Sequence, residues 1–342
     1  MLTKYSFLKV RLILLLLAKG KLSLKKISNL VHCYMAYWLK LDRSGQTPFI
    51  INFELSNHCN ESCVFCRSAS GKIFDQNPKS TGEPIPKGTM RLEVFQDIVR
   101  QAKDTLLMAV PYVNGEPFIY KHLGQALRTA KECNVATMIA SNGILLGEEN
   151  IDKILDNDLD FIKVHISGYT NDVHQIQHRV GDVEVIKSNL KMLAGKIRER
   201  KARILVLVDY ILYKHNVHQL DLFRNFAKEC GFLFSVRPGN PRGMEDMEKA
   251  QPLRIQSTTH IPCDWLWKAL TVNWNGDLLP CCDYVVWSST SGYGEHKVGE
   301  TDLLDLWNGP EVIGMRKTHR DQGRAPIAIC SGCKRTGIEF KF

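Results

Sequence analysis

The chain has 342 residues, of which 44% are hydrophobic and 24% are charged. This is the balance of an ordinary globular protein, and it excludes an intrinsically disordered chain. The formal net charge is +9, and nearly all of it comes from residues 1–45, where nine basic residues accompany a single acidic one. A basic segment on a nearly neutral body indicates contact with an anionic surface such as membrane headgroups. No nucleic-acid partner is expected, because no recognisable nucleic-acid-binding module accompanies the charges.

Residues 1–48 are predicted to form a basic amphipathic arm of two helices, over 7–19 and 23–41, with a break at Gly20. The apolar run 12–18 is far shorter than the roughly 20 residues that span a bilayer. Lysines follow this run where a secretory signal would have small residues, so a signal peptide is disfavoured. Two interpretations remain open: the helices pack on the rest of the protein, or they make peripheral contact with a membrane.

From residue 49 onward, strand-like and helix-like segments alternate. Apolar runs predict strands over 49–55, 107–113, 135–140, 160–166, 203–212 and 233–237. Amphipathic patterns predict helices over 92–104, 119–133, 148–155, 183–200 and 217–230. This alternation predicts a parallel sheet, and the lack of a dinucleotide-binding fingerprint favours an open, partial barrel over residues 49–240. Its chemistry is then expected at the carboxyl ends of the strands.

Residues 241–342 are predicted to form a small C-terminal domain. The polar stretch 239–260 predicts a linker, and Trp274-Asn275-Gly276 predicts the turn of a hairpin. A short helix is expected to start at residue 303. Because this segment has little apolar material for a core of its own, metal ligation is expected to stabilise it.

The chain contains eleven cysteines. A secreted disulfide scaffold is disfavoured because the chain is long and most of its cysteines fall into two groups that resemble metal sites. A reducing cytoplasm is therefore the expected compartment, with membrane association through residues 1–45 as an open alternative.

The first group is Cys59, Cys63 and Cys66, three cysteines in one loop after the first predicted strand. A structural zinc site normally takes four protein ligands. Three thiolates on a 4Fe–4S cube instead leave one iron open to another ligand. An open iron–sulfur cluster is therefore the favoured interpretation, with zinc and buried structural cysteines as alternatives.

This CxxxCxxC spacing, with Phe65 before the third cysteine, resembles the defining motif of the radical S-adenosylmethionine (SAM) superfamily. The resemblance covers roughly residues 49–237 and implies a partial (β/α)6 barrel. It also implies that Cys59, Cys63 and Cys66 hold a catalytic 4Fe–4S cluster whose open iron binds SAM. One electron would then cleave SAM to a 5′-deoxyadenosyl radical that abstracts hydrogen from the substrate.

The resemblance further implies which residues contact SAM. Gly115-Glu116-Pro117 resembles the motif that holds the SAM amino group, and a carboxylate suits an ammonium. The remaining residues implied to contact the methionine, ribose, carboxylate or adenine of SAM are Ser141, Asn142, Ser167, Arg179 and Phe65. A plain turn, or a solvated arginine in the case of Arg179, is the alternative.

The second group is Cys263, Cys281, Cys330 and Cys333. With its surrounding tryptophans it resembles the auxiliary-cluster extension called SPASM, or Twitch in its shortened form. The resemblance implies one auxiliary 4Fe–4S cluster on these four cysteines, since the full SPASM form holds two clusters and needs more cysteines. Zinc is the alternative, and Cys282 is either a spare ligand or a hydrogen-atom donor.

The expected enzyme oxidises or otherwise modifies a sugar-type, cyclitol-type or lipid-linked small molecule, since relatives with a single auxiliary cluster include an aminocyclitol dehydrogenase. Epimerisation or crosslinking of a ribosomally made peptide is the alternative. A non-enzymatic two-cluster electron-transfer protein is disfavoured, because an electron carrier has no use for an exposed iron. Reductive cleavage of SAM implies a reducing partner such as flavodoxin or ferredoxin.

Overall fold

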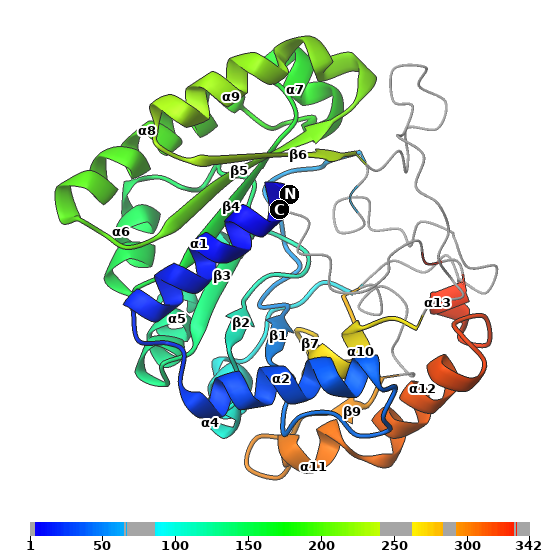
Figure 1. The fold of residues 1–342 in the computed structure, drawn as a ribbon. Helices are drawn as coiled ribbons and strands as arrows, with labels where there is room; N and C mark the ends of the chain where they lie inside the picture. The colour runs from blue at the N-terminus through cyan, green and yellow to red at the C-terminus, as the bar shows by residue number, and fades with distance from the viewer. Residues whose placement is uncertain are drawn as a thin grey trace.

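The computed structural model describes residues 4–64, 66, 86–239, 262–282, 292–331 and 333. Its centre is a sheet with the strand order β6-β5-β4-β3-β2-β1-β7-β8-β9. Six strands follow one another as neighbours and run parallel: β1 (Ile50–Phe53), β2 (Met108–Val110), β3 (Ala136–Ser141), β4 (Phe161–Ile166), β5 (Leu205–Leu212) and β6 (Leu233–Pro238). Because β6 and β9 are edges, the barrel is open, and Figure 1 shows the two ends of the sheet apart. The predicted partial α/β barrel is confirmed.

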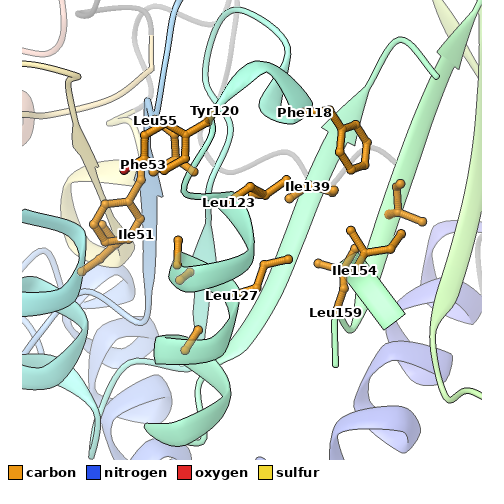
Figure 2. Packing of buried hydrophobic residues seen from close by; sticks show 14 of the residues in the cluster. Ile51, Phe53, Leu55, Phe118, Tyr120, Leu123, Leu127, Ile139, Ile154 and Leu159 are labelled. Atoms are coloured by element: carbon orange, nitrogen blue, oxygen red, sulfur yellow. The ribbon is translucent and has the colours of Figure 1, made fainter. Parts of the chain in front are cut away.

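Helices cover one face of this sheet: α4 (Leu92–Ala102), α5 (Leu123–Glu132), α6 (Glu148–Asp156), α8 (Val183–Arg200) and α9 (Leu220–Glu229). Alternate strand residues point into this layer, because side chains on a strand alternate between its two faces. Phe53 and Ile139 are examples, and they belong to one cluster with Leu123 and Leu127 of α5 (Figure 2). These residues form the main core of the described protein.

The N-terminal helices α1 (Lys4–Ala18) and α2 (Leu24–Trp38) lie on the opposite, inner face of the sheet. Leu8 packs on Phe161 and Leu207, and Leu16 packs in a cluster with inward-facing residues of β1, β2 and β3. Gly20, with φ +67°, makes the break between the two helices. One face of these helices therefore packs on the barrel, as the first of the two interpretations of the arm expects.

The C-terminal segment extends the barrel sheet. Strand β7 (Ala269–Val272) pairs in parallel with β1, and the hairpin continues through β8 (Asp277–Leu279) and β9 (Gly294–Glu295). The helices α10 (Trp265–Lys268), α11 (Leu303–Trp307), α12 (Pro310–Asp321) and α13 (Ala328–Ser331) follow or flank it. Trp307 is fully buried and belongs to the main core. The C-terminal segment, which has few apolar residues for a core of its own, thus packs its apolar residues into the core of the barrel.

Several elements differ from the sequence-based expectation. Helix α7 (Asn171–His178) was not predicted, nor was α12. The helix expected over 119–133 is divided into the 3-10 turn η1 (Pro117–Ile119) and α5, and the turn η2 (Lys214–Gln219) precedes α9. Most of the predicted linker 239–260 lies outside the described residues. Across the described part of the chain, no helix combines the length and the apolar character required to cross a membrane.

Candidate functional site

The loop after β1 brings three thiols together. Burial raises the pKa of the Cys59 thiol to about 12, and the nearby Glu116 and Cys66 act in the same direction. Burial also raises the pKa of Cys63, with further contributions from Glu61 and the other two thiols. A metal centre reverses this preference, because a coordinating thiol is deprotonated by the metal charge. The donor set therefore fits a cationic iron–sulfur cluster better than it fits free thiolates.

The Gly115-Glu116-Pro117 turn is fastened to this cysteine loop. Gly115 has φ +72°, and a Cβ there would lie 2.4 Å from the Ser56 carbonyl oxygen and 2.6 Å from that of His58. The Glu116 N–H donates a hydrogen bond of 2.8 Å to the His58 carbonyl. Only glycine allows the two backbones to approach this closely, so this turn fixes the position of the cysteine loop.

The Glu116 carboxylate connects the ends of β2 and β3. It is 1% exposed and accepts hydrogen bonds from Ser141 Oγ (2.9 Å), Asn142 N (2.9 Å) and Phe118 N (3.3 Å). Burial raises the pKa of Glu116 to about 7. The Asn142 amide lies 3.8 Å from Cys59 Sγ. A buried carboxylate with a raised pKa, beside the thiols, is suited to receive a cationic group from a ligand.

Ser167 follows β4 and is fully buried, and its hydroxyl has no hydrogen-bond partner among the described residues. A buried hydroxyl without a partner at the rim is available to hydrogen-bond a ligand. Arg179 is exposed at the C-terminal end of α7, with φ +53°. Phe65 lies outside the described residues.

Sequence reasoning missed a buried polar cluster next to Cys63. His178 Nδ1 lies 2.9 Å from Glu61 Oε2 and 3.4 Å from Cys63 Sγ. The His178 ring stacks on that of His174, with centroids 4.2 Å apart. The signals present in the sequence were an acidic residue inside the cysteine motif and two histidines at helical i, i+4 spacing.

A second polar network lines the inner wall of the half-barrel. Asp209 on β5 accepts hydrogen bonds from Arg237 Nε (2.6 Å), His165 Nδ1 (3.0 Å) and Ser235 Oγ (2.6 Å). Although burial opposes ionisation, His165 and Arg237 hold the pKa of Asp209 well below its usual range. Burial raises the pKa of Tyr112, which follows β2.

The second cysteine group also converges. Burial raises the pKa of the Cys263 thiol, and the neighbouring Cys330 and Cys333 thiols add to the effect. Cys281 and Cys330 both pack on the cluster around Leu279. Sulfur atoms from three distant parts of the C-terminal segment thus gather in one place, and this donor set could hold a fully ligated metal centre.

Comparisons with known proteins give two family matches. Residues 53–220 match the model described as the Radical SAM superfamily, and residues 263–334 match SPASM, an iron–sulfur cluster-binding domain. Among curated proteins, the mycofactocin maturase MftC of Mycobacterium ulcerans is 25% identical over 64% of this chain and 55% of its own length. The PqqA peptide cyclase of Xanthomonas campestris is 19% identical over 86% of this chain and 81% of its own.

Among solved structures, Streptococcus suis SuiB bound to the precursor peptide SuiA matches with a TM-score of 0.59 and 16% identity. The match covers 79% of this chain and 66% of SuiB. At this identity the likeness establishes a shared fold. The chain spans about half the length of the MftC proteins it matches.

Proposed function

Because this chain belongs to the radical SAM superfamily and carries a C-terminal domain of the SPASM type, we propose that it modifies a peptide through a carbon-centred radical. The two domains imply 4Fe–4S clusters and SAM as cofactors. The observation that carries the proposed chemistry is the convergence of three thiols, the buried Glu116 carboxylate and the unsatisfied Ser167 hydroxyl at one rim.

In this proposal, Cys59, Cys63 and Cys66 hold the catalytic cluster. When bound, the cluster and SAM supply a radical that removes hydrogen from the substrate. Glu116 receives the SAM amino group, and Gly115 keeps this carboxylate against the cysteine loop through the close contacts with Ser56 and His58.

Other residues at the rim complete the proposed SAM site. Ser141 and Asn142 orient the Glu116 carboxylate through their hydrogen bonds to it. The Ser167 hydroxyl is available to a ribose or methionine oxygen at the end of β4. Cys263, Cys281, Cys330 and Cys333 would hold the auxiliary cluster, which would supply a one-electron redox centre.

A peptide substrate is supported better than the sugar, cyclitol or lipid-linked molecule favoured by the sequence analysis. The PqqA peptide cyclase matches this chain over most of the length of both proteins. The matched SuiB structure contains a precursor peptide. A flavodoxin or ferredoxin is proposed as the electron donor.

The test uses anaerobically reconstituted full-length chain with SAM and reduced flavodoxin. Short peptides encoded beside the gene are compared with aminocyclitols and nucleotide sugars, and 5′-deoxyadenosine and substrate mass are measured. A peptide should stimulate 5′-deoxyadenosine release and change in mass, and the Cys59→Ala variant should do neither. Stimulation by a cyclitol or sugar alone would return the assignment to the small-molecule class.

A further inference from the structure

The N-terminal helix pair has two apolar faces, of which the packing on the barrel uses one. Leu8 and Leu16 of α1, with Cys33 and Ala36 of α2, are buried against the rest of the protein. From the sequence, packing on the barrel and contact with a membrane are competing interpretations of these helices. In the structure the two interpretations apply to different faces of the helices. One face packs on the barrel, and apolar residues on the other face remain exposed.

The uncovered apolar residues recur at helical spacing along each of the two helices. We call them the outer stripe, which consists of Val10, Ile13, Leu14, Leu17, Leu24, Ile27, Val31, Met35 and Trp38. Trp38 is 70% exposed and Leu24 is 86% exposed. Residues 10–41 contain eleven of the exposed large hydrophobic residues, and the remainder of the described chain contains eight. Such a concentration marks an interaction site, since monomeric proteins rarely expose large apolar patches.

The charges around the outer stripe select its partner. Lys9, Arg11 and Arg43 are exposed, and so is Lys25, which pairs at the surface with Asp104. The one acidic residue of the segment, Asp42, is engaged by Arg320 and Lys317. A second copy of this chain would bring the same positive charges to the interface, whereas an anionic bilayer surface would complement them.

The helices are held in place before any partner binds. Lys19 and Lys21, whose side chains are 6% and 4% exposed, both pair with Asp160 at 2.7 Å. Docking through the outer stripe therefore requires no detachment from the barrel, and little conformational entropy is lost on binding.

We propose that the outer stripe is a peripheral docking surface for an anionic lipid bilayer. The two helices lie in the interface with their apolar residues among the acyl-chain ends, while the flanking basic residues contact lipid phosphates. Trp38, near the end of α2, lies at headgroup depth, where indole rings are favoured. The surface fixes the orientation of the half-barrel relative to the membrane, and it is independent of the substrate proposed above.

The test is sedimentation of the full-length, cluster-loaded protein with vesicles. Phosphatidylcholine vesicles are compared with vesicles in which part of the lipid is phosphatidylglycerol. Binding to the anionic vesicles should exceed binding to the neutral ones by about tenfold. It should weaken as salt approaches 1 M, where the Debye length falls to about 3 Å.

Two sets of substitutions separate the outer stripe from the general surface. The stripe variant combines Ile13→Gln, Leu17→Gln, Val31→Gln, Met35→Gln and Trp38→Gln. The matched control places the same residue at exposed apolar positions elsewhere: Val217→Gln, Leu222→Gln, Val298→Gln and Leu304→Gln. The stripe variant should lose about tenfold in vesicle binding, and the control should bind as the wild type does. Iron content and SAM affinity should be unchanged in both.

A second variant, Lys9→Glu with Arg11→Glu, keeps the test decisive if the stripe variant folds poorly, because both positions are exposed. It should abolish the preference for anionic vesicles. Trp38→Phe should remove part of the blue shift in tryptophan emission on vesicle binding. Equal binding by the wild type and the charge variant would overturn the proposal. So would a wild-type dimer that fails to bind vesicles and becomes monomeric in the stripe variant, which would assign the surface to a second copy.

Discussion

The Nδ1 atom of His178 lies 3.4 Å from the sulfur of Cys63, although 115 residues separate the two in the sequence. Helix α7 brings the imidazole to the cysteine loop, and Glu61 holds it there through a 2.9 Å contact to the same nitrogen. The one hydrogen that Nδ1 can carry is shared between the Glu61 carboxylate, at the shorter distance, and the Cys63 sulfur. A donor beside a ligating sulfur stabilises the more negative, reduced state of an iron–sulfur centre.

Replacing this imidazole should therefore lower the potential of the proposed catalytic cluster. For His178→Ala we expect a decrease of about 40 mV, the one-electron equivalent of a hydrogen bond of about 1 kcal/mol. An EPR-monitored redox titration measures it. Gln175→Ala, at an exposed position on the same helix, is the control and should leave the potential unchanged. An unchanged potential in His178→Ala would show that His178 serves only in packing.

The two cysteine groups predict two clusters. Anaerobically reconstituted protein should contain about eight irons and eight sulfides per chain. Changing Cys59, Cys63 and Cys66 to Ala should leave about four irons, and changing the four C-terminal cysteines should also leave about four. Zinc in the C-terminal site of anaerobically purified protein would contradict the proposed auxiliary cluster.

Glu116→Gln should weaken SAM binding by about 1–3 kcal/mol, because the ammonium loses a charged hydrogen-bond acceptor. The isosteric amide preserves the shape of the turn, so iron content should not change. Isothermal titration with SAM measures the difference. Equal affinity in the two proteins would assign Glu116 to positioning the loops alone.

The affinity for SAM should also depend on pH through the same residue. The pKa of Glu116 is about 7 because of burial, so the charged form becomes more abundant as pH rises. Between pH 6 and pH 7, below the range in which an α-amino group titrates, the ionised fraction increases about fivefold. SAM affinity should increase by a similar factor in the wild type and should be flat in Glu116→Gln. A parallel increase in the variant would place the titrating group elsewhere.

The buried ion pairs under α1 should contribute strongly to stability. Replacing both Asp158 and Asp160 by Ala removes the two carboxylates that the buried lysines Lys19 and Lys21 share. Leaving these buried charges without a partner costs about 3–5 kcal/mol. The matched control is Asp104→Ala, which removes the exposed pair with Lys25 and should cost about 0–1 kcal/mol. Urea denaturation of both variants measures the free energy of unfolding, and equal losses would contradict the expectation.

The sequence predicted local elements well where the local signal was strong. Helix α8 has the predicted bounds, since its hydrophobic period is regular and the Asp182 carboxylate caps its N-terminus. Helix α7 escaped prediction because it is short and polar, and contacts from distant segments stabilise it. His178 could not be assigned for the same reason, because its partners are Glu61 and Cys63.

Pairing between distant segments was also beyond the sequence. The Trp274-Asn275-Gly276 turn predicted a hairpin, and β7 and β8 form it. Nothing in the local pattern specifies that β7 pairs with β1, since strand patterning encodes which face is buried but not which neighbour is chosen. The apolar content of α1 likewise predicted a helix without showing which of its two apolar faces is buried.

Because β7 pairs with β1, the segments that carry the two cysteine groups share one sheet. Strand β1, which leads into the first cysteine loop, lies between β2 and β7. The ring of Trp274 also packs directly on Gly88. A Cβ at this position would lie 2.1 Å from the ring, so a larger residue would not fit. A truncation before residue 262 would leave β1 as an unprotected edge and invite strand-to-strand aggregation. The C-terminal segment therefore extends the barrel sheet past β1 and protects the edge of the strand that leads into the first cysteine loop.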